Sequence, residues 1–241
     1  MKTAILSDIH GNLTAFEAVL ADIRRQSPDL VLHGGDLADT GSSPIEIVDR
    51  IRHLGWKGVM GNTDEMLVCP ESLDDFASQS SAPPALWETI RQIASATRAT
   101  LGDERVAWLR GLPRVRTEDT FALVHATPES CWRAPGAEAA DAELQAIYGS
   151  LCHPVVVFGH THRPSIRHIM GQPRLLINTG SVGLPYDGDP RASYLIIEGS
   201  TPLIQRVEYD LEKELKALSS CGLPGAAWTA RMLRTSSPQL P

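Results

Sequence analysis

The chain has 241 residues, of which 42% are hydrophobic, and this length allows a sizeable core in one α/β domain. The formal net charge is −7, and no run of Lys or Arg exceeds a pair, which argues against polymeric nucleic acid as a partner. Apolar runs such as Val155 to Phe158 fall far short of the about 20 residues that a membrane span needs. We therefore expect a cytoplasmic protein that does not bind membranes.

Strands and helices alternate in the first part of the chain. The expected strands are Lys2–Ser7, Leu30–Leu32 and Lys57–Met60, and the expected helices are Leu13–Arg25 and Ile45–Leu54. Asn12 is placed to cap the first helix, and His33 is expected to pack at a strand end. Each strand ends in a polar loop that contains glycine. This alternation indicates βαβ units and a largely parallel sheet.

The second part of the chain has a different organisation. Polar loops and helices over residues 70–112 predict a helical insertion. Further strands are expected over Phe121–His125, Val155–Phe158, Arg174–Asn178, Ser193–Glu198 and Leu203–Tyr209. Turns separate several of them, which favours antiparallel pairing. The predicted fold class is α/β, with two packed mixed sheets flanked by helices, in one domain over residues 1–220 followed by a tail over residues 221–241.

Every polar loop at the end of a predicted strand carries side chains that can bind metal. Five loops together supply two carboxylates, one amide and four imidazoles, from Asp8, His10, Asp36, Asn62, His125, His160 and His162. Any one such motif is weak, and a lone strand-end histidine is more often structural. Five loops at the carboxyl ends of strands, where α/β sheets place their ligands, make a metal site the better interpretation. Mixed oxygen and nitrogen ligands favour manganese, with iron, cobalt, nickel or zinc as alternatives, over calcium and magnesium.

The order of these motifs resembles that of the calcineurin-like metallophosphoesterase family. The motifs are Asp8-x-His10, Gly35-Asp36, Gly61-Asn62-x-Asp64, His125 and Gly159-His160-Thr161-His162, and the loop Asn178–Gly183 is similar to a turn in small bacterial members. The resemblance implies a two-sheet sandwich with two divalent ions. One ion would be held by Asp8, His10 and His162, the other by Asn62, His125 and His160, with Asp36 bridging both. A metal-bridging hydroxide would then attack a small phosphorylated or nucleotide substrate.

Thr63 departs from the resemblance. The phosphoprotein-phosphatase-like members carry a histidine after the metal-binding asparagine, and that histidine can protonate a leaving alkoxide. A threonine hydroxyl is too weak an acid for this task. We therefore expect leaving groups that are already stable anions, as in a phosphodiesterase with aryl or cyclic substrates or in a nucleotide phosphoanhydride hydrolase. The stretch His125–Pro128 also resembles bacterial dinucleoside tetraphosphate hydrolases.

Four further side chains are candidates for supporting the site. Asp64 is expected either to support a metal ligand or to cap a helix. Arg133, Arg163 and Arg191 are candidate substrate contacts, with exposed, solvated side chains as the alternative. Other functions are a catalytically weak metal-binding scaffold or a nucleotide sensor of the same fold. All seven ligand positions are filled, which favours the enzyme. The oligomeric state is open and includes a homo-oligomer.

Overall fold

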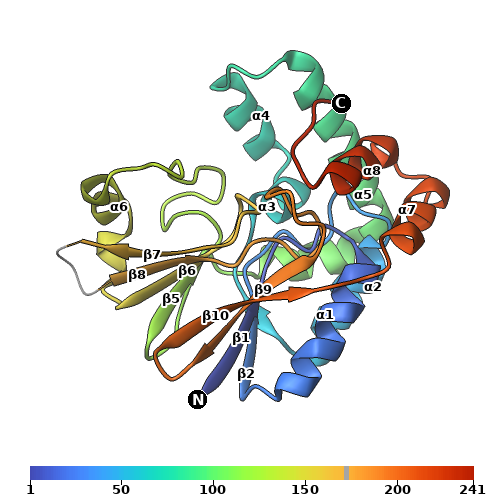
Figure 1. The fold of residues 1–241 in the computed structure, drawn as a ribbon. Coiled ribbons are helices and arrows are strands. Elements are labelled where there is room, and N and C mark those ends of the chain that lie inside the picture. The colour runs from blue at the N-terminus through green and yellow to red at the C-terminus, as the bar shows by residue number, and fades with distance from the viewer. Residues whose placement is uncertain (171–173) are drawn as a thin grey trace.

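Two five-stranded sheets pack face to face in the computed structural model, which describes residues 1–170 and 174–241 (Figure 1). The first sheet, in the order β10-β9-β1-β2-β3, consists of β1 (Lys2–Leu6), β2 (Leu30–His33), β3 (Lys57–Gly58), β9 (Ala192–Glu198) and β10 (Thr201–Val207). The second, in the order β4-β5-β6-β8-β7, consists of β4 (Val115–Thr117), β5 (Phe121–Val124), β6 (Val155–Phe158), β7 (Ser165–Ile169) and β8 (Arg174–Asn178). Each sheet pairs three strands in parallel and its other strands antiparallel, so both sheets are mixed, as predicted. The antiparallel pairing expected in the second part of the chain holds for β9 and β10 but is wrong for β5, β6 and β8, which are parallel because α6 and β7 lie in the connections between them.

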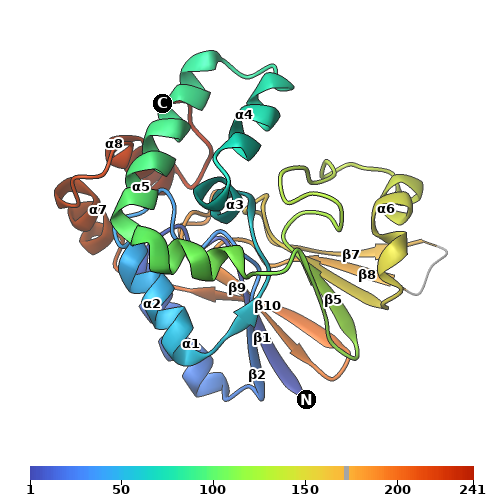
Figure 2. The ribbon, with the colours of Figure 1, turned by 180° about the vertical axis from the view of Figure 1, so that it is seen from behind.

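Helices cover both outer faces of this sandwich (Figure 2). The first sheet packs against α1 (Leu13–Gln26), α2 (Pro44–Leu54) and α5 (Pro84–Arg110), and the second against α6 (Asp141–Tyr148) and the short helical turn Gly149–Leu151. The remaining helices are α3 (Asn62–Val68), α4 (Glu71–Ser78), α7 (Leu211–Ser220) and α8 (Ala226–Thr235). No helix in residues 1–170 or 174–241 is long and apolar enough to cross a membrane. The predicted fold class is confirmed.

Alternating side chains explain the four layers. In β1, Ile5 joins the core between the sheets, whereas Leu6 joins the core beneath the helices. In β5, Leu123 joins the core between the sheets and Val124 faces α6. Successive side chains of a strand point to opposite faces, so strands buried on both faces read as nearly continuous apolar runs. The short apolar runs in the sequence therefore correspond to strands covered on both sides.

Several elements differ from the predictions. The helical insertion is present, and α5 bends sharply at Gly102, whose φ of 72° and ψ of 168° are not helical. The strands β4 and β7 and the helices α6, α7 and α8 were not foreseen. The helix α8 lies in the expected tail, where Met232 and Leu233 form an apolar cluster with Leu215 and Leu218 of α7. The domain boundary at residue 220 stays a prediction.

Candidate metal centre

The seven predicted ligands meet at one edge of the sandwich. We call them the strand-end cluster, and they are Asp8, His10, Asp36, Asn62, His125, His160 and His162. They follow β1, β2, β3, β5 and β6 directly or within a few residues. Because β1, β2 and β3 are parallel to one another, as are β5 and β6, the carboxyl ends in each sheet lie together. Segments far apart in sequence therefore converge.

Four members of the cluster surround one position. Asp8 Oδ1 lies 3.3 Å from His162 Nε2, and His10 Nε2 lies 3.2 Å from His162 Nε2. Asp36 Oδ2 is 3.6 Å from His10 Nε2. One ligand atom from each of these four residues lies within 4.8 Å of every other, and all four residues are buried. This spacing suits side chains that share a bound cation.

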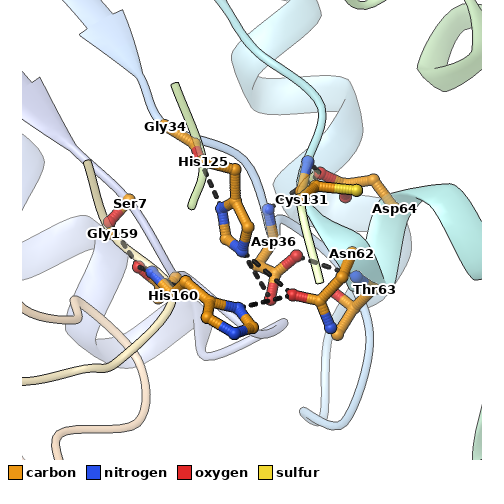
Figure 3. A network of polar contacts seen from close by, with 12 residues as sticks. Ser7, Gly34, Asp36, Asn62, Thr63, Asp64, His125, Cys131, Gly159 and His160 are labelled. Carbon is orange, nitrogen blue, oxygen red and sulfur yellow. Dashed lines mark hydrogen bonds and ion pairs between the residues drawn. The ribbon is translucent and has the colours of Figure 1, made fainter. Parts of the chain in front are cut away.

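A second position lies on the other side of Asp36. Asn62 Oδ1 is 3.0 Å from His125 Nε2 and 2.9 Å from His160 Nδ1 (Figure 3). Asp36 Oδ2 is 3.5 Å from His125 Nε2. The same carboxylate oxygen is thus almost equally distant from a histidine of each group.

In three of the histidines, the hydrogen bond made by Nδ1 leaves Nε2 as the nitrogen that can accept. Nδ1 faces a backbone carbonyl in each ring: His10 faces Asp39 O at 3.2 Å, His125 faces Gly34 O at 2.7 Å, and His162 faces Leu184 O at 2.6 Å. A carbonyl can only accept, so Nδ1 carries the proton and Nε2 of a neutral ring carries a lone pair. Lone pairs and carboxylates therefore point at the same space. The donor set fits divalent cations.

Protonation near neutral pH also suits metal binding. Burial lowers the pKa of His10 and of His160 to about 4, so both rings are neutral. Burial alone would raise the pKa of Asp8, but the attraction of His162 and the contact with it hold that pKa well below its usual range. His125 differs, because Asp36 and Asp8 outweigh burial and raise its pKa. An ion bound beside His125 would compete with a proton.

Five cluster residues have a left-handed backbone conformation. They are Asp8, His10, Asp36, His160 and His162, with φ of 55°, 49°, 54°, 65° and 57°. This conformation is uncommon for residues other than glycine, although Asn, Asp and His adopt it more often than the rest, and it costs about 1–3 kcal/mol per residue. Backbone hydrogen bonds impose it here, including Asp8 N to Gly35 O and His10 N to Asp36 O, both 3.0 Å. These hydrogen bonds hold the loops in the conformation that brings the ligands together.

Asp64 ties two of these loops together. Its Oδ2 accepts from Asp36 N at 2.8 Å and Gly61 N at 3.0 Å, and its Oδ1 accepts from Leu37 N at 3.0 Å (Figure 3). Thr63 N in turn donates to Asp36 Oδ1 at 2.9 Å. Burial and the nearby Asp36 raise the pKa of Asp64 to about 6. Asp64 thus accepts from the N-cap residue of α3 and from the loop that carries Asp36. Its support of a metal ligand stays a prediction.

The loop Asn178–Gly183 holds the backbone of two loops that carry cluster residues. Ser181 Oγ donates to Asp8 O at 2.7 Å, and Asn178 Nδ2 donates to Gly159 O at 2.7 Å. Ser181 is completely buried. Its hydroxyl positions the Asp8 loop.

The three predicted substrate-binding arginines are exposed and engage other protein groups. Arg133 donates to Gln79 Oε1 at 2.8 Å, Arg163 donates to Tyr186 O at 3.0 Å, and Arg191 pairs with Asp189 at 2.7 Å. Their contact with substrate stays a prediction.

A pocket of about 240 Å³ lies next to the cluster, and the aromatic residues that line it were not predicted from the sequence. His10, Asn62, Thr63 and His160 contribute to it from the cluster side. We call it the aromatic pocket, because five rings line it: Phe76, Trp87, Trp132, Tyr186 and Trp228. Asp39 also contributes, and burial raises its pKa to about 7. The five rings come from α4, α5, α8 and two loops, and no local motif connects them.

The sequence matches known proteins over most of its length. The family model for the calcineurin-like phosphoesterase superfamily domain matches residues 1–201. An uncharacterised protein of Methanocaldococcus jannaschii is 31% identical over 242 residues, covering 92% of this chain and 93% of that protein. The symmetrical bis(5'-nucleosyl)-tetraphosphatase of Pectobacterium carotovorum subsp. carotovorum is 29% identical over 160 residues. That match covers 64% of this chain and 53% of the relative, so it spans about half the relative's length.

Solved structures show the same architecture. A metallophosphoesterase from Sphaerobacter thermophilus has a TM-score of 0.80 at 27% identity, covering 98% of this chain and 99% of that one. A hypothetical protein from Pyrococcus horikoshii has a TM-score of 0.83 at 18% identity, covering 99% of both chains, which shows the fold alone. The chain belongs to the calcineurin-like phosphoesterase superfamily and is a metal-dependent hydrolase of phosphoric ester or anhydride bonds, as its ordered motifs predicted.

Proposed function

We propose that the chain hydrolyses a phosphodiester or a nucleotide phosphoanhydride with two divalent metal ions. Manganese is the expected metal and the cytoplasm the expected compartment. Asp8, His10 and His162 would hold one ion, and Asn62, His125 and His160 the other. The position of Asp36 carries the proposal, because its Oδ2 lies 3.6 Å from His10 Nε2 and 3.5 Å from His125 Nε2.

A carboxylate between two cations has a clear electrostatic purpose. Ions in binuclear sites lie about 3.5–4 Å apart, where their mutual repulsion is strong without an anion between them. Asp36 supplies that anion, and Thr63 N and the loop held by Asp64 fix its orientation. When bound, such a pair of ions polarises the phosphoryl group and activates water as the nucleophile.

No side chain is needed as the nucleophile. Ser181 is completely buried and donates its hydroxyl to Asp8 O. Cys131 is also buried, and burial together with the hydrogen bond to Glu65 raises the pKa of its thiol far above neutrality. Neither group offers an ionised, accessible nucleophile at neutral pH. Direct attack by water therefore fits the site better than attack by either side chain.

Thr63 favours substrates with good leaving groups. It lines the pocket beside Asn62, where a general acid would have to stand. Its hydroxyl cannot donate a proton to an alkoxide at a useful rate. Phosphoanhydrides, aryl esters and strained cyclic diesters need no such proton. The similarity to a symmetrical bis(5'-nucleosyl)-tetraphosphatase supports the anhydride among these choices.

A comparison of substrates tests this function. The protein would be reconstituted with manganese and assayed with bis-p-nitrophenyl phosphate, p-nitrophenyl phosphate, diadenosine tetraphosphate and the alkyl ester glycerol phosphate. We expect turnover of the diester or the tetraphosphate and almost none of glycerol phosphate. If two ions bind and none of the four is hydrolysed, the proposal is wrong for these substrate classes, and a scaffold or nucleotide sensor becomes the better interpretation. Equal rates on glycerol phosphate and the aryl esters would contradict the argument from Thr63.

A further inference from the structure

We propose that the aromatic pocket binds the nucleobase of a nucleotide substrate. This inference rests on the proposed function, because the strand-end cluster would hold the phosphoryl group next to the pocket. His10, Asn62 and His160 belong to the cluster and also line the pocket. A ligand whose phosphoryl group lies at the cluster therefore has its remaining part directed toward the aromatic rings.

The rings are arranged to receive another flat group. Phe76 and Trp132 have centroids 5.0 Å apart at 31°, and Phe76 and Trp87 have centroids 5.7 Å apart at 81°. All five rings of the pocket are half-buried, whereas core aromatics such as Phe16 and Phe121 are almost completely buried. The pocket rings thus retain free surface. Bases stack readily on such surfaces, since every base has an aromatic face.

Charge and size favour an uncharged ring as the occupant. Neither lysine nor arginine occurs among the described residues that line the pocket. The nearby guanidinium of Arg133 lies 5.2 Å from the centre of the Phe76 ring and donates to Gln79, so it is already engaged by the protein. The volume of about 240 Å³ lies just below the about 300 Å³ at which pockets for drug-sized ligands begin. The pocket therefore suits one uncharged ring system rather than a phosphate chain.

An unpaired hydrogen-bond donor favours a base over a plain hydrocarbon ring. Within residues 1–170 and 174–241, the buried indole nitrogen of Trp87 has no hydrogen-bond partner, and neither has the buried hydroxyl of Thr63. Buried polar groups are normally paired. The indole N–H can only donate, and the ring nitrogens and carbonyl groups of bases accept. A nucleobase that reaches the Trp87 N–H offers it an acceptor, whereas a phenyl group offers none.

The walls come from segments outside the two sheets. Phe76 lies on α4, Trp87 on α5, and Trp228 on α8. Figures 1 and 2 both show α4, α5 and α8 gathered on the side of the molecule where α3 lies. In this proposal, the helical insertion and α8 together form the site that selects the base of the substrate.

Tryptophan fluorescence tests base binding without turnover. Three of the five tryptophans line the pocket, so a stacked base should quench emission. The full chain loaded with manganese would be titrated with AMP and with ribose 5-phosphate, which differ only by the base, at an excitation wavelength that adenine does not absorb. We expect AMP to quench and to bind at least about tenfold more tightly than ribose 5-phosphate. Equal binding of the two would overturn the proposal.

Variants locate the effect. Phe76→Leu should weaken AMP binding about tenfold by removing a stacking surface, and Trp87→Phe about threefold by removing the donor. Trp108→Phe is the control, because Trp108 lies outside the pocket, and it should leave AMP binding unchanged. Unchanged manganese content would show that each variant is folded. If both pocket variants bind AMP as the wild type does, the assignment is wrong.

Turnover separates this proposal from the proposed function. Diadenosine tetraphosphate should have a higher kcat/KM than inorganic tetraphosphate, and Phe76→Leu should remove most of that preference. Base-dependent quenching with no hydrolysis of any substrate would sink the hydrolase proposal and support the pocket assignment. Equal hydrolysis of both tetraphosphates, with no quenching by AMP, would support the hydrolase proposal and overturn the pocket assignment.

Discussion

The strand-end cluster and the aromatic pocket are neighbours, but they are built in different ways. The cluster stands on short loops whose backbone is strained and held by hydrogen bonds, and five of its seven residues are buried. The pocket stands on helices of the insertion and of the C-terminal segment, and its five rings are half-buried. In the proposed function, backbone geometry would position the metal ligands, whereas the packing of helices and loops around the pocket would select the substrate.

Gly61→Ala should have the largest effect, because it should disrupt the strand-end cluster and leave the aromatic pocket in place. Gly61 has a φ of −93°, which any residue adopts, but an added methyl group would collide with the carboxylate and the backbone nitrogen of Asp36. We expect loss of metal binding and a fall in turnover on the order of 1,000-fold, since a displaced bridge costs several kcal/mol. Manganese content and kcat/KM measure the effect, and AMP should still quench fluorescence.

Gly136→Ala is the matched control, because an added methyl group there meets nothing within 4 Å. Full activity of Gly61→Ala would show that the Asp36 loop is not positioned as described. Loss of AMP binding together with metal would show that the two regions are not separable.

Asp64→Asn should have a smaller effect on the same loop. The substitution keeps the shape of the side chain but removes the charge that accepts three backbone N–H groups. Groups that orient metal ligands typically change metal affinity by about 10–100-fold when altered. Titration with manganese should show a loss in that range, again with AMP quenching intact. Wild-type affinity would mean that Asp64 only caps α3.

The buried His33, at the end of β2, should make the stability of the protein depend on pH. Its ring is completely buried, neither ring nitrogen has a partner in the described part of the chain, and burial, with a contribution from Arg116, lowers its pKa to about 3. Below pH 6.5 the unfolded chain takes up a proton at His33 that the folded chain refuses until about pH 3, so acid reduces stability in that window. Between pH 7.5 and 5 the loss is about 2 kcal/mol.

Glutamine does not titrate, so His33→Gln removes this pH dependence. Between pH 7.5 and 5, the free energy of unfolding should fall by about 2 kcal/mol more in the wild type than in the variant. Chemical denaturation at the two pH values measures it. A constant difference between wild type and variant would mean that the folded protein protonates His33 normally.

Thr63→Ala should have the smallest effect, although Thr63 stands where the two regions meet. Its backbone N–H, which the substitution keeps, holds Asp36, and its hydroxyl is too weakly acidic to serve a leaving group. We expect kcat/KM for diadenosine tetraphosphate to change by less than about threefold, within the range of one neutral hydrogen bond. A loss as large as that of Gly61→Ala would refute the argument about the leaving group.

The same comparison explains what the sequence could predict. Asp8 and His10 follow an apolar strand, and the carboxyl ends of parallel strands lie together, so their convergence with Asp36 was foreseeable. The left-handed backbone of these residues was not, because Asp and His adopt that conformation only in a small fraction of cases. Trp132 and Trp228 lie 96 positions apart, and only the tertiary packing of α8 brings them to one pocket. Glycine and proline around α8 also concealed a ten-residue helix.

The number of manganese ions bound per chain, in the wild type and in Asp36→Asn, tests the central claim most directly. Asp36 Oδ2 lies between the two groups of ligands, so the neutral amide should fail to hold two cations side by side. The account predicts two ions in the wild type and at most one, weakly bound, in Asp36→Asn. A single ion in the wild type, or two ions in the variant, would contradict a binuclear centre bridged by Asp36.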